Sequence, residues 1–69
     1  MNSLLPSLIP VDSSAISEIG YDGSTLSIRF RESGRVYDHP KVPYSVYEGL
    51  MHASSKGAFY NRFIRGRYR

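Results

Sequence analysis

The sequence predicts a small α+β domain, a three-stranded antiparallel β-meander followed by two α-helices packed on one face of the sheet, in the order β-β-β-α-α. Three observations predict it. The chain of 69 residues is long enough for one hydrophobic core but not for two. Apolar and polar residues alternate over 25–31, directly after the turn-forming pair Asp22-Gly23. Beyond Pro43 the apolar residues recur at the three- and four-residue spacings of a helix.

The first two strands are predicted to form a β-hairpin. Residues 15–21 are strand-like, and Asp22-Gly23 tolerates the positive φ angles of a tight turn. In the second strand the core face carries Leu26, Ile28 and Phe30, and the opposite face carries Thr25, Ser27, Arg29 and Arg31. A slip of one residue would expose the three apolar side chains, at a cost of about 1.5–3 kcal/mol each. We therefore expect a well-specified register.

The third strand is predicted at 35–39, after a short loop at 32–34. It can pair antiparallel with the second strand without a long crossover. We expect Val36 on the inner face, and on the outer face Arg35, Tyr37 and His39 together with Arg29 and Arg31. Asp38 then points inward and needs a hydrogen-bond partner or a place at the sheet edge. This arrangement predicts a second basic and aromatic surface.

An extended or mobile arm is predicted at 1–11, and a single domain at 12–69. The arm contains Pro6 and Pro10, and its apolar residues follow neither a strand nor a helix period. It is either a frayed terminus or a segment that covers the domain or binds a partner. It lacks the basic start of a signal peptide. Its prolines also interrupt the apolar stretch long before it reaches the roughly 20 residues of a membrane span. We predict neither feature.

Two helices are predicted after the sheet. The first runs from about Pro43 to Ala53, and Gly49 within it costs about 1 kcal/mol relative to Ala but permits a close approach. The second begins near Lys56, after two serines that can cap it. The predicted core packs Val46, Leu50, Phe59 and Phe63 against Leu26, Ile28 and Phe30, with Ile64 also buried. Tyr60 either joins this core or contacts a partner.

Positive charge is concentrated at the C-terminal end. The net charge is +3, yet residues 1–55 carry four basic and six acidic side chains, whereas residues 56–69 carry five basic and no acidic ones. Most of these basic residues fall off the apolar stripe of the second helix, so its solvent side should be strongly electropositive. Such a face suits an anionic partner such as nucleic acid. Arginines near a helix end also complement the helix dipole, so both interpretations are retained.

The sequence contains no catalytic or metal-binding motif. It has no cysteine, and its two histidines, His39 and His52, fall on different predicted elements. Neither histidine has an obvious carboxylate partner for a nucleophilic triad, and Lys56-Gly57 lacks the spacing of a phosphate-binding P-loop. We therefore predict no enzyme, no cofactor and no metal. The lack of cysteine is compatible with a reducing cytoplasm, which is the predicted location.

Two stretches carry a family resemblance. VDSSAISEIGYD, from Val11, is similar to an opening strand SS-A-I-x-x-I-G-Y-D, and SKGAFYNRFIRGRY, from Ser55, is similar to a closing motif S-K-G-x-[FY]-[FY]-N-x-x-I-R-x-x-[YF]. The chain thereby resembles the KTSC domain, named for the C-terminal extension of certain lysyl-tRNA synthetases. The resemblance implies a domain with no attached catalytic activity and a suggested role in RNA binding. Where the family usually has Tyr-x-Tyr, this chain has Tyr37-Asp38-His39, and histidine can also stack on a base.

The favoured function is a non-enzymatic small binding module, an RNA-binding accessory domain that contacts tRNA or single-stranded RNA through its basic C-terminal helix. The alternative is a protein–protein interaction module that docks an acidic surface of a transcription or translation complex. The candidate contact residues are Lys56, Tyr60, Arg62, Arg65 and Arg67, with a second patch of Arg29, Arg31, Tyr37 and His39. No membrane partner is predicted, and the pattern specifies no oligomeric state.

Overall fold

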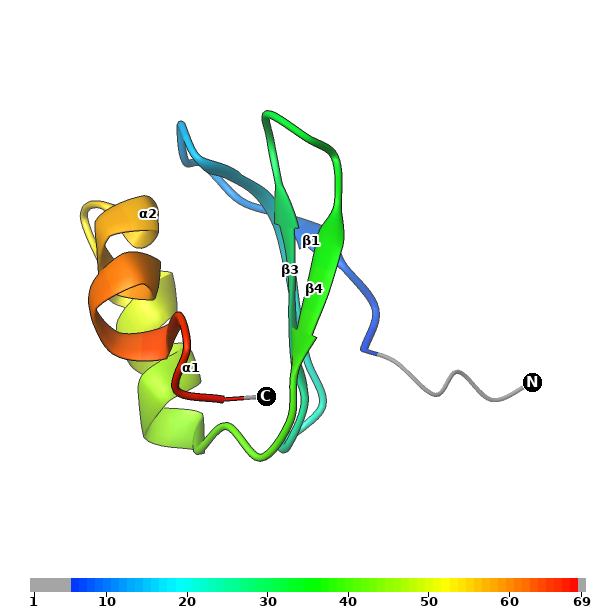
Figure 1. Ribbon diagram of the computed structural model, residues 1–69, viewed down its shortest axis with the longest axis vertical. Coiled ribbons are helices and arrows are strands. Elements are labelled where there is room, and N and C mark those ends of the chain that lie inside the picture. The colour runs from blue at the N-terminus through cyan, green and yellow to red at the C-terminus, as the bar shows by residue number, and fades with distance from the viewer. Residues whose placement is uncertain (1–5, 69) are drawn as a thin grey trace.

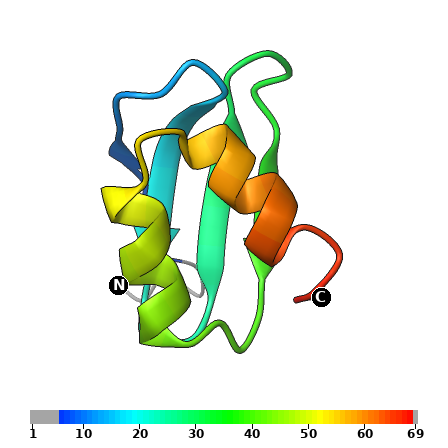
Figure 2. The same ribbon diagram turned by 90° about the vertical axis from the view of Figure 1, so that its left-hand side faces the viewer.

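Four antiparallel strands form one sheet, and successive helical segments cover one of its faces (Figure 1, Figure 2). The computed structural model describes residues 6–68. The strands lie side by side in the order β1 (Ile9–Pro10), β2 (Ile16–Tyr21), β3 (Leu26–Phe30) and β4 (Val36–His39). The helices are α1 (Tyr44–His52), α2 (Lys56–Phe59) and the π-helix η1 (Tyr60–Ile64), which continues α2 directly. The α+β class, with an antiparallel sheet followed by helices, is confirmed, but the sheet has four strands and not three.

The additional strand, β1, comes from the predicted arm. Its two residues pair with Ile19 and Glu18 of β2. Pro10 is tolerated there because β1 is an edge strand, where one side needs no ladder N–H. Upstream, the backbone oxygen of Ser7 lies so close to Gly20 that a Cβ on this glycine would stand 2.5 Å from it. The described part of the arm therefore packs against the sheet, and its first five residues lie outside the described part.

The β2–β3 hairpin turns where it was predicted to turn. Asp22 Oδ1 accepts hydrogen bonds from the backbone N–H groups of Ser24, at 2.9 Å, and Thr25, at 2.7 Å. These bonds hold the pKa of the Asp22 carboxyl below its usual range. Gly23 adopts a φ of 97°, which glycine reaches without a steric cost. The turn residues therefore set the hairpin as the sequence indicates.

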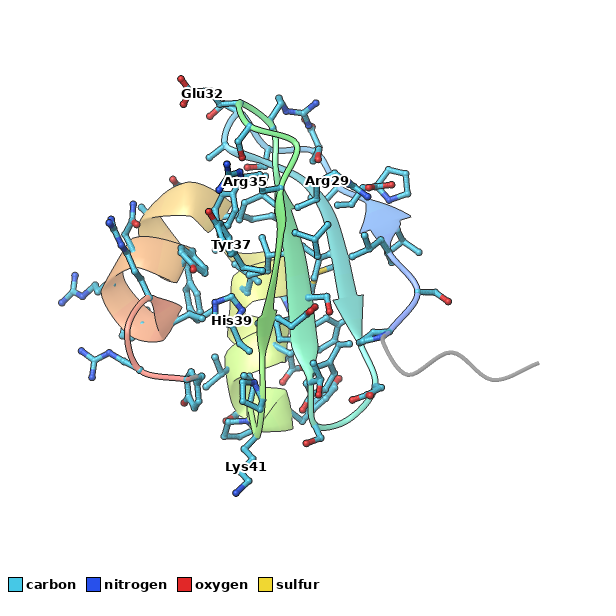
Figure 3. All side chains as sticks on the ribbon, turned by 45° about the vertical axis from the view of Figure 1, so that its right-hand side comes forward. Arg29, Glu32, Arg35, Tyr37, His39 and Lys41 are labelled. Carbon is cyan, nitrogen blue, oxygen red and sulfur yellow. The ribbon has the colours of Figure 1, made fainter. Side chains whose placement is uncertain are left out.

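The pairing of β3 with β4 reverses the predicted faces of the third strand. The paired residues are Leu26–His39, Ser27–Asp38, Ile28–Tyr37 and Arg29–Val36. Directly paired residues share a face, so Tyr37 and His39 lie on the inner face, toward the helices, and Arg29 lies on the other side of the sheet (Figure 3). The prediction that Tyr37 and His39 face outward with the arginines was wrong. Val36 and Asp38 take the outer face instead.

This reversal has a physical reason. The only aliphatic residue of β4 is Val36, so alternation within the strand is too weak to set its register. The inner positions accept rings because these pack against the aromatic side chains of Phe30 and Tyr60. On the outer face, the Ser27 hydroxyl donates a hydrogen bond to the Asp38 carboxylate. Asp38 thereby obtains the partner that a carboxylate in this position needs.

Helix α1 follows Pro43, and α2 packs closely against it. A Cβ on Gly49 would stand 2.7 Å from the ring of Phe59, so this glycine permits the close approach that was predicted. Helix α2 starts at a capped N-terminus, where the Ser55 hydroxyl accepts a hydrogen bond from the N–H of Ala58 at 3.3 Å. Both predicted helix starts are confirmed within one residue.

The π-helix η1 decides which residues of the C-terminal segment are buried. The N–H of Arg65 reaches back five residues to the carbonyl of Tyr60, at 2.8 Å. Tyr60 and Ile64 face the sheet and are buried, whereas Phe63 is 45% exposed, with the guanidinium of Arg62 5.5 Å from its ring centre. The prediction that Phe63 is a core residue was wrong. Only Tyr60 and Ile64 of the apolar stripe face the sheet, whereas Phe63 lies on the neighbouring side of the helical segment.

The hydrophobic core lies between the inner face of the sheet and the helices. Its buried residues are Ile16, Ile19, Leu26, Ile28, Val42, Leu50, Tyr60 and Ile64, with Phe30, Val46 and Phe59 packed partly buried against them. A β-bulge in β2 allows Ile16 and Ile19, which are three positions apart, to face this core together. Within residues 6–68, no helix has the length and apolar character needed to cross a membrane.

The contact between Ser7 and Gly20 yields a stability prediction. Gly20→Ala places a methyl group where the Ser7 backbone stands, so the free energy of unfolding should fall by about 1–3 kcal/mol. Urea unfolding measures the change. With the first seven residues removed, the same substitution should be neutral or stabilising, since glycine is a poor strand residue. An equal loss in both backgrounds would contradict packing of the arm on the sheet.

Candidate functional site

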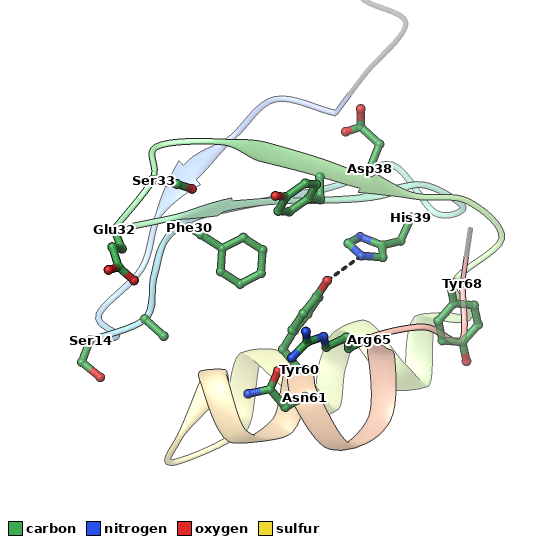
Figure 4. Close-up of a pocket in the computed structure, with 12 residues that line it drawn as sticks. Ser14, Phe30, Glu32, Ser33, Asp38, His39, Tyr60, Asn61, Arg65 and Tyr68 are labelled. Atoms are coloured by element: carbon green, nitrogen blue, oxygen red, sulfur yellow. Dashed lines mark hydrogen bonds between the residues drawn. The ribbon is translucent and has the colours of Figure 1, made fainter.

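A pocket of about 860 Å³ lies between the edge strand β4 and the end of η1 (Figure 4). It is lined by Ser14, Ala15, Phe30, Glu32, Ser33, Tyr37, Asp38, His39, Tyr60, Asn61, Arg65 and Tyr68, and is called the aromatic groove below. Its volume falls within the range of roughly 300–1,000 Å³ that is common for ligand sites. The groove brings together residues of β3 and β4, of the loops before β2 and between β3 and β4, and of the C-terminal segment, so the fold assembles it from distant parts of the sequence.

The base of the groove is a hydrogen-bonded pair, His39 and Tyr60 (Figure 4). The Nδ1 atom of His39 lies 3.2 Å from the backbone oxygen of Leu26, and Nε2 lies 3.0 Å from the Tyr60 hydroxyl. A carbonyl only accepts, so Nδ1 carries the proton, and in the neutral imidazole Nε2 accepts from the phenol. His39 is only 6% exposed. This pair therefore ties the edge strand to the π-helix.

Burial changes the acidity of Tyr60. Removal of its phenol from water raises the pKa of Tyr60, an effect that the positive charge of Arg65 partly offsets and that Tyr37 reinforces. The phenol therefore keeps its proton at physiological pH. Arg65 is close enough to influence this ring electrostatically, which places its guanidinium beside the groove.

Aromatic rings form the walls of the groove. Phe30 packs edge-on against Tyr60, with ring centres 4.9 Å apart, and in a tilted arrangement against Tyr37, with ring centres 5.5 Å apart. Tyr37 is 46% exposed, so about half of its surface remains available to a ligand. Tyr68, from the C-terminal turn, lies at the far end from Glu32 in Figure 4. The groove thus combines the packed rings of Phe30 and Tyr60 with the solvent-exposed ring of Tyr37.

The C-terminal arginines have different surroundings. Arg65 lines the groove, whereas Arg62 lies over the Phe63 ring on the outside of η1. Arg67 is exposed in the turn that follows, where Gly66 adopts a φ of 76°. Within residues 6–68, the one ion pair lies elsewhere, between Arg29 and Glu18, so no described carboxylate neutralises these three arginines. Arg62, Arg65 and Arg67 are therefore exposed cations without an ion-pair partner among the described residues.

Lys56 has a structural contact. Its Nζ atom donates a hydrogen bond to the backbone oxygen of Ala53 at 3.3 Å, and its side chain is half-buried. It stands at the start of α2, while the groove lies at the end of η1. The structure therefore does not bring Lys56 together with Arg65 in the groove.

The predicted second patch is divided between structural contacts. Arg29 pairs with Glu18 at 2.6 Å and donates to the Gly34 carbonyl at 2.7 Å, on the outer face of the sheet. Arg31 donates to the backbone oxygens of Ser13, at 3.0 Å, and Ile16, at 3.3 Å. Arg29 thus links β3 to β2 and to the loop before β4, and Arg31 binds the backbone before and at the start of β2. Of the predicted patch, only Tyr37 and His39 line the groove.

Several groove residues were not among the predicted contacts. Phe30 was assigned to the core, and Asn61 and Tyr68 were predicted only as members of the closing motif. Tyr68 and Asn61 stand in the same motif as Arg65, which is the pattern that could have indicated them. Glu32 and Ser33 belong to a surface loop and carried no indication in the sequence.

The groove offers stacking surfaces, hydrogen-bonding groups and one cation. Within the described residues there is no group of three histidine, aspartate or glutamate side chains that could hold a metal ion. Its polar groups include the Asn61 amide, the Arg65 guanidinium and the carboxylates of Glu32 and Asp38. The Asp38 carboxylate already accepts a hydrogen bond from the Ser27 hydroxyl on the outer face of the sheet. This set suits recognition of a planar ligand that carries a negative charge.

The fold and the groove define a small α+β domain whose helical C-terminal segment closes over the edge of an antiparallel sheet. The chain belongs to the KTSC domain family, whose model matches residues 12–68. The match begins after β1 and runs to Tyr68, so it includes every residue that lines the groove. The predicted family resemblance is therefore confirmed.

Similar proteins include both large and small chains. A lysine–tRNA ligase from Nostoc punctiforme is 42% identical over 64 residues, which are 90% of this chain but only 11% of the ligase. A protein from Tsukamurella paurometabola is 40% identical over 62 residues, covering 87% of this chain and 91% of that protein. The crystal structure of a KTSC domain protein from Yersinia pestis superposes with a TM-score of 0.84 at 40% identity, covering 91% and 90% of the two chains.

The Tyr60–His39 bond yields a second stability prediction. Tyr60→Phe removes the hydroxyl and leaves the buried Nε2 atom of His39 without its partner, so the protein should lose about 1–3 kcal/mol of stability at neutral pH. Urea unfolding near pH 7 measures this loss. Tyr44→Phe provides the matched control, because Tyr44 is 61% exposed, and it should change stability little. Equal effects of the two substitutions would contradict a structural role for the bond.

The same substitution should also change how stability depends on alkaline pH. In the unfolded chain Tyr60 ionises near its ordinary pKa of about 10, whereas the folded pKa is higher. The stability supplied by the neutral phenol is therefore fully present below about pH 10 and is lost as pH rises through the folded pKa. Tyr60→Phe should lose less stability than the wild type between about pH 9 and about pH 11. Parallel curves would show that burial of this phenol does not affect folding.

Proposed function

We propose that the protein is a non-enzymatic RNA-binding module that holds single-stranded RNA along its C-terminal segment. The observation that carries the proposal is that residues 56–69 carry five basic and no acidic side chains, and that one of these cations, Arg65, lines the aromatic groove. Proteins that bind unpaired nucleic acid combine these two features, since arginines neutralise phosphates and aromatic rings stack on bases.

The distribution of charge supports this proposal. Arg62, in η1, and Arg65 and Arg67, in the turn that follows, are exposed, and no described carboxylate pairs with them. An arginine that is already paired loses its partner when it binds phosphate, whereas these three incur no such loss. Arg29, in contrast, is held by Glu18 on the opposite face. The C-terminal segment is therefore the favoured contact surface.

The relatives also support an RNA partner. The lysine–tRNA ligases that match 90% of this chain are proteins whose name refers to tRNA, and the match covers a small part of each. A module of this size attached to a tRNA ligase would serve it by holding the RNA substrate near the enzyme. For this chain, we propose the same accessory role toward tRNA or another RNA with unpaired nucleotides.

Neutralising two arginines tests the proposal. Arg65→Gln with Arg67→Gln should weaken binding to a fluorescein-labelled single-stranded RNA of ten nucleotides, as measured by fluorescence anisotropy. If each arginine neutralises one phosphate, the slope of log affinity against log salt should become shallower by roughly 1.4, since each contact to a single strand contributes about 0.7. The loss should be largest at low salt.

The matched control removes the same charge elsewhere. Arg35→Gln with Lys41→Gln neutralises two exposed side chains that do not line the groove. This pair should leave the salt slope nearly unchanged. An equal change in both double variants would show that net charge alone drives binding, and a lack of RNA binding even at low salt would refute the proposed function.

A further inference from the structure

We propose that the aromatic groove holds one unstacked base of the bound strand, with the phosphate of that nucleotide on Arg65. This inference rests on the proposed function and names the unit that the groove recognises. A nucleotide pairs a flat, aromatic base with a phosphate anion, and the groove pairs flat rings with a cation. The two sets of chemical groups are complementary.

Tyr37 provides the stacking surface. The residue is 46% exposed although it lies on the inner face of the sheet, where Leu26, Ile28 and His39 are buried. Phe30 supports it from one side, with ring centres 5.5 Å apart and planes inclined by 56°. An exposed ring that is held in place by another ring loses little conformational freedom when a base stacks on it. Tyr37 is therefore the open side of an otherwise closed aromatic cluster.

Charge gives the bound nucleotide a direction. In Figure 4, Glu32 stands at one end of the groove and Tyr68 at the other, and the Arg65 guanidinium lies between them, beside Tyr60 and Asn61. The other carboxylate of the lining, that of Asp38, accepts a hydrogen bond from the Ser27 hydroxyl and points away from Tyr60 in Figure 4. Repulsion by the Glu32 carboxylate and attraction by the Arg65 guanidinium both place the phosphate beside Arg65 and away from Glu32. The Asn61 amide, on the helical side of the groove, offers a donor and an acceptor to the edge of the base.

The base of the groove is rigid before any ligand binds. Tyr60 and His39 are both buried, and their hydrogen bond fixes the two rings 5.4 Å apart and nearly perpendicular. The backbone N–H of Arg65 donates a hydrogen bond to the Tyr60 carbonyl at the end of the π-helix, so Arg65 is held next to these two rings. Cation and stacking surface are thus set relative to each other by the fold, so the site is preorganised for a ligand that uses both.

Three small probes separate the parts of a nucleotide. Titration of the ¹⁵N-labelled protein with AMP, which has base and phosphate, should shift the amide resonances of the groove and saturate. Adenosine lacks the phosphate and ribose 5-phosphate lacks the base, so each should bind more weakly than AMP. Ribose 5-phosphate should shift resonances near Arg65 but not those near Tyr37.

Two substitutions assign these parts to residues. Tyr37→Leu removes the stacking ring and should weaken AMP binding by about fivefold or more, with ribose 5-phosphate unaffected. Arg65→Gln should abolish the preference for AMP over adenosine. Tyr44→Leu is the matched control, because it removes an exposed tyrosine that does not line the groove, and it should leave AMP binding unchanged.

The outcomes distinguish this inference from the proposed function. If single-stranded RNA binds but AMP causes no shifts in the groove, or Tyr37→Leu leaves AMP and RNA binding intact, the base site is wrong while RNA binding stands. If no RNA binds at all, both proposals fail. A hexaglutamate peptide that shifts the groove and is weakened by Tyr37→Leu, where AMP has no effect, would assign the groove to an acidic protein partner instead.

Discussion

The hydrogen bond between Tyr60 and His39 is the contact on which the rest of the site depends. It joins the last strand of the sheet to the π-helix across the open edge of the domain, and it satisfies two polar groups that are otherwise buried in an aromatic cluster. Because Nδ1 of His39 is bound to the Leu26 carbonyl, the imidazole is fixed from both sides. The position of Arg65 follows, since this residue bonds through its N–H to the carbonyl of the same tyrosine. One pair of rings thereby sets the base and the charged side of the groove.

The sequence predicts the parts of the fold that local chemistry controls. The Asp22-Gly23 turn, the alternation in β3 and the serine cap of α2 each act within a few residues, and all three are found as expected. The strand β1 was missed because two residues with a proline carry no strand pattern of their own, and only the neighbouring edge of β2 makes them a strand. The faces of β4 were reversed for a related reason. Tertiary pairing, not alternation, sets the register of so short a segment.

The candidate site was predicted in part. Arg65 was predicted from the basic, acid-free end of the chain, and Tyr60 and Tyr68 belong to the closing motif. These groove residues could be found from the sequence because they lie close together in it. Arg29 and Arg31 were grouped with them by charge alone, but their guanidinium groups bind Glu18 and backbone carbonyls away from the groove. Charge in a sequence does not show which cations are already paired. The groove itself depends on the β3–β4 register, so no pattern within one segment could have predicted it.

The central claim is that the edge of β4 and the C-terminal segment form one surface for an unpaired nucleotide. Intermolecular NOEs between a short single-stranded RNA and the ¹³C-labelled protein test it most directly. The structure predicts NOEs from base protons to the ring protons of Tyr37 and from ribose protons to the side chain of Arg65. NOEs confined to the outer face of the sheet, around Arg29, or to Phe63 on the outside of η1, with none to Tyr37, would contradict it.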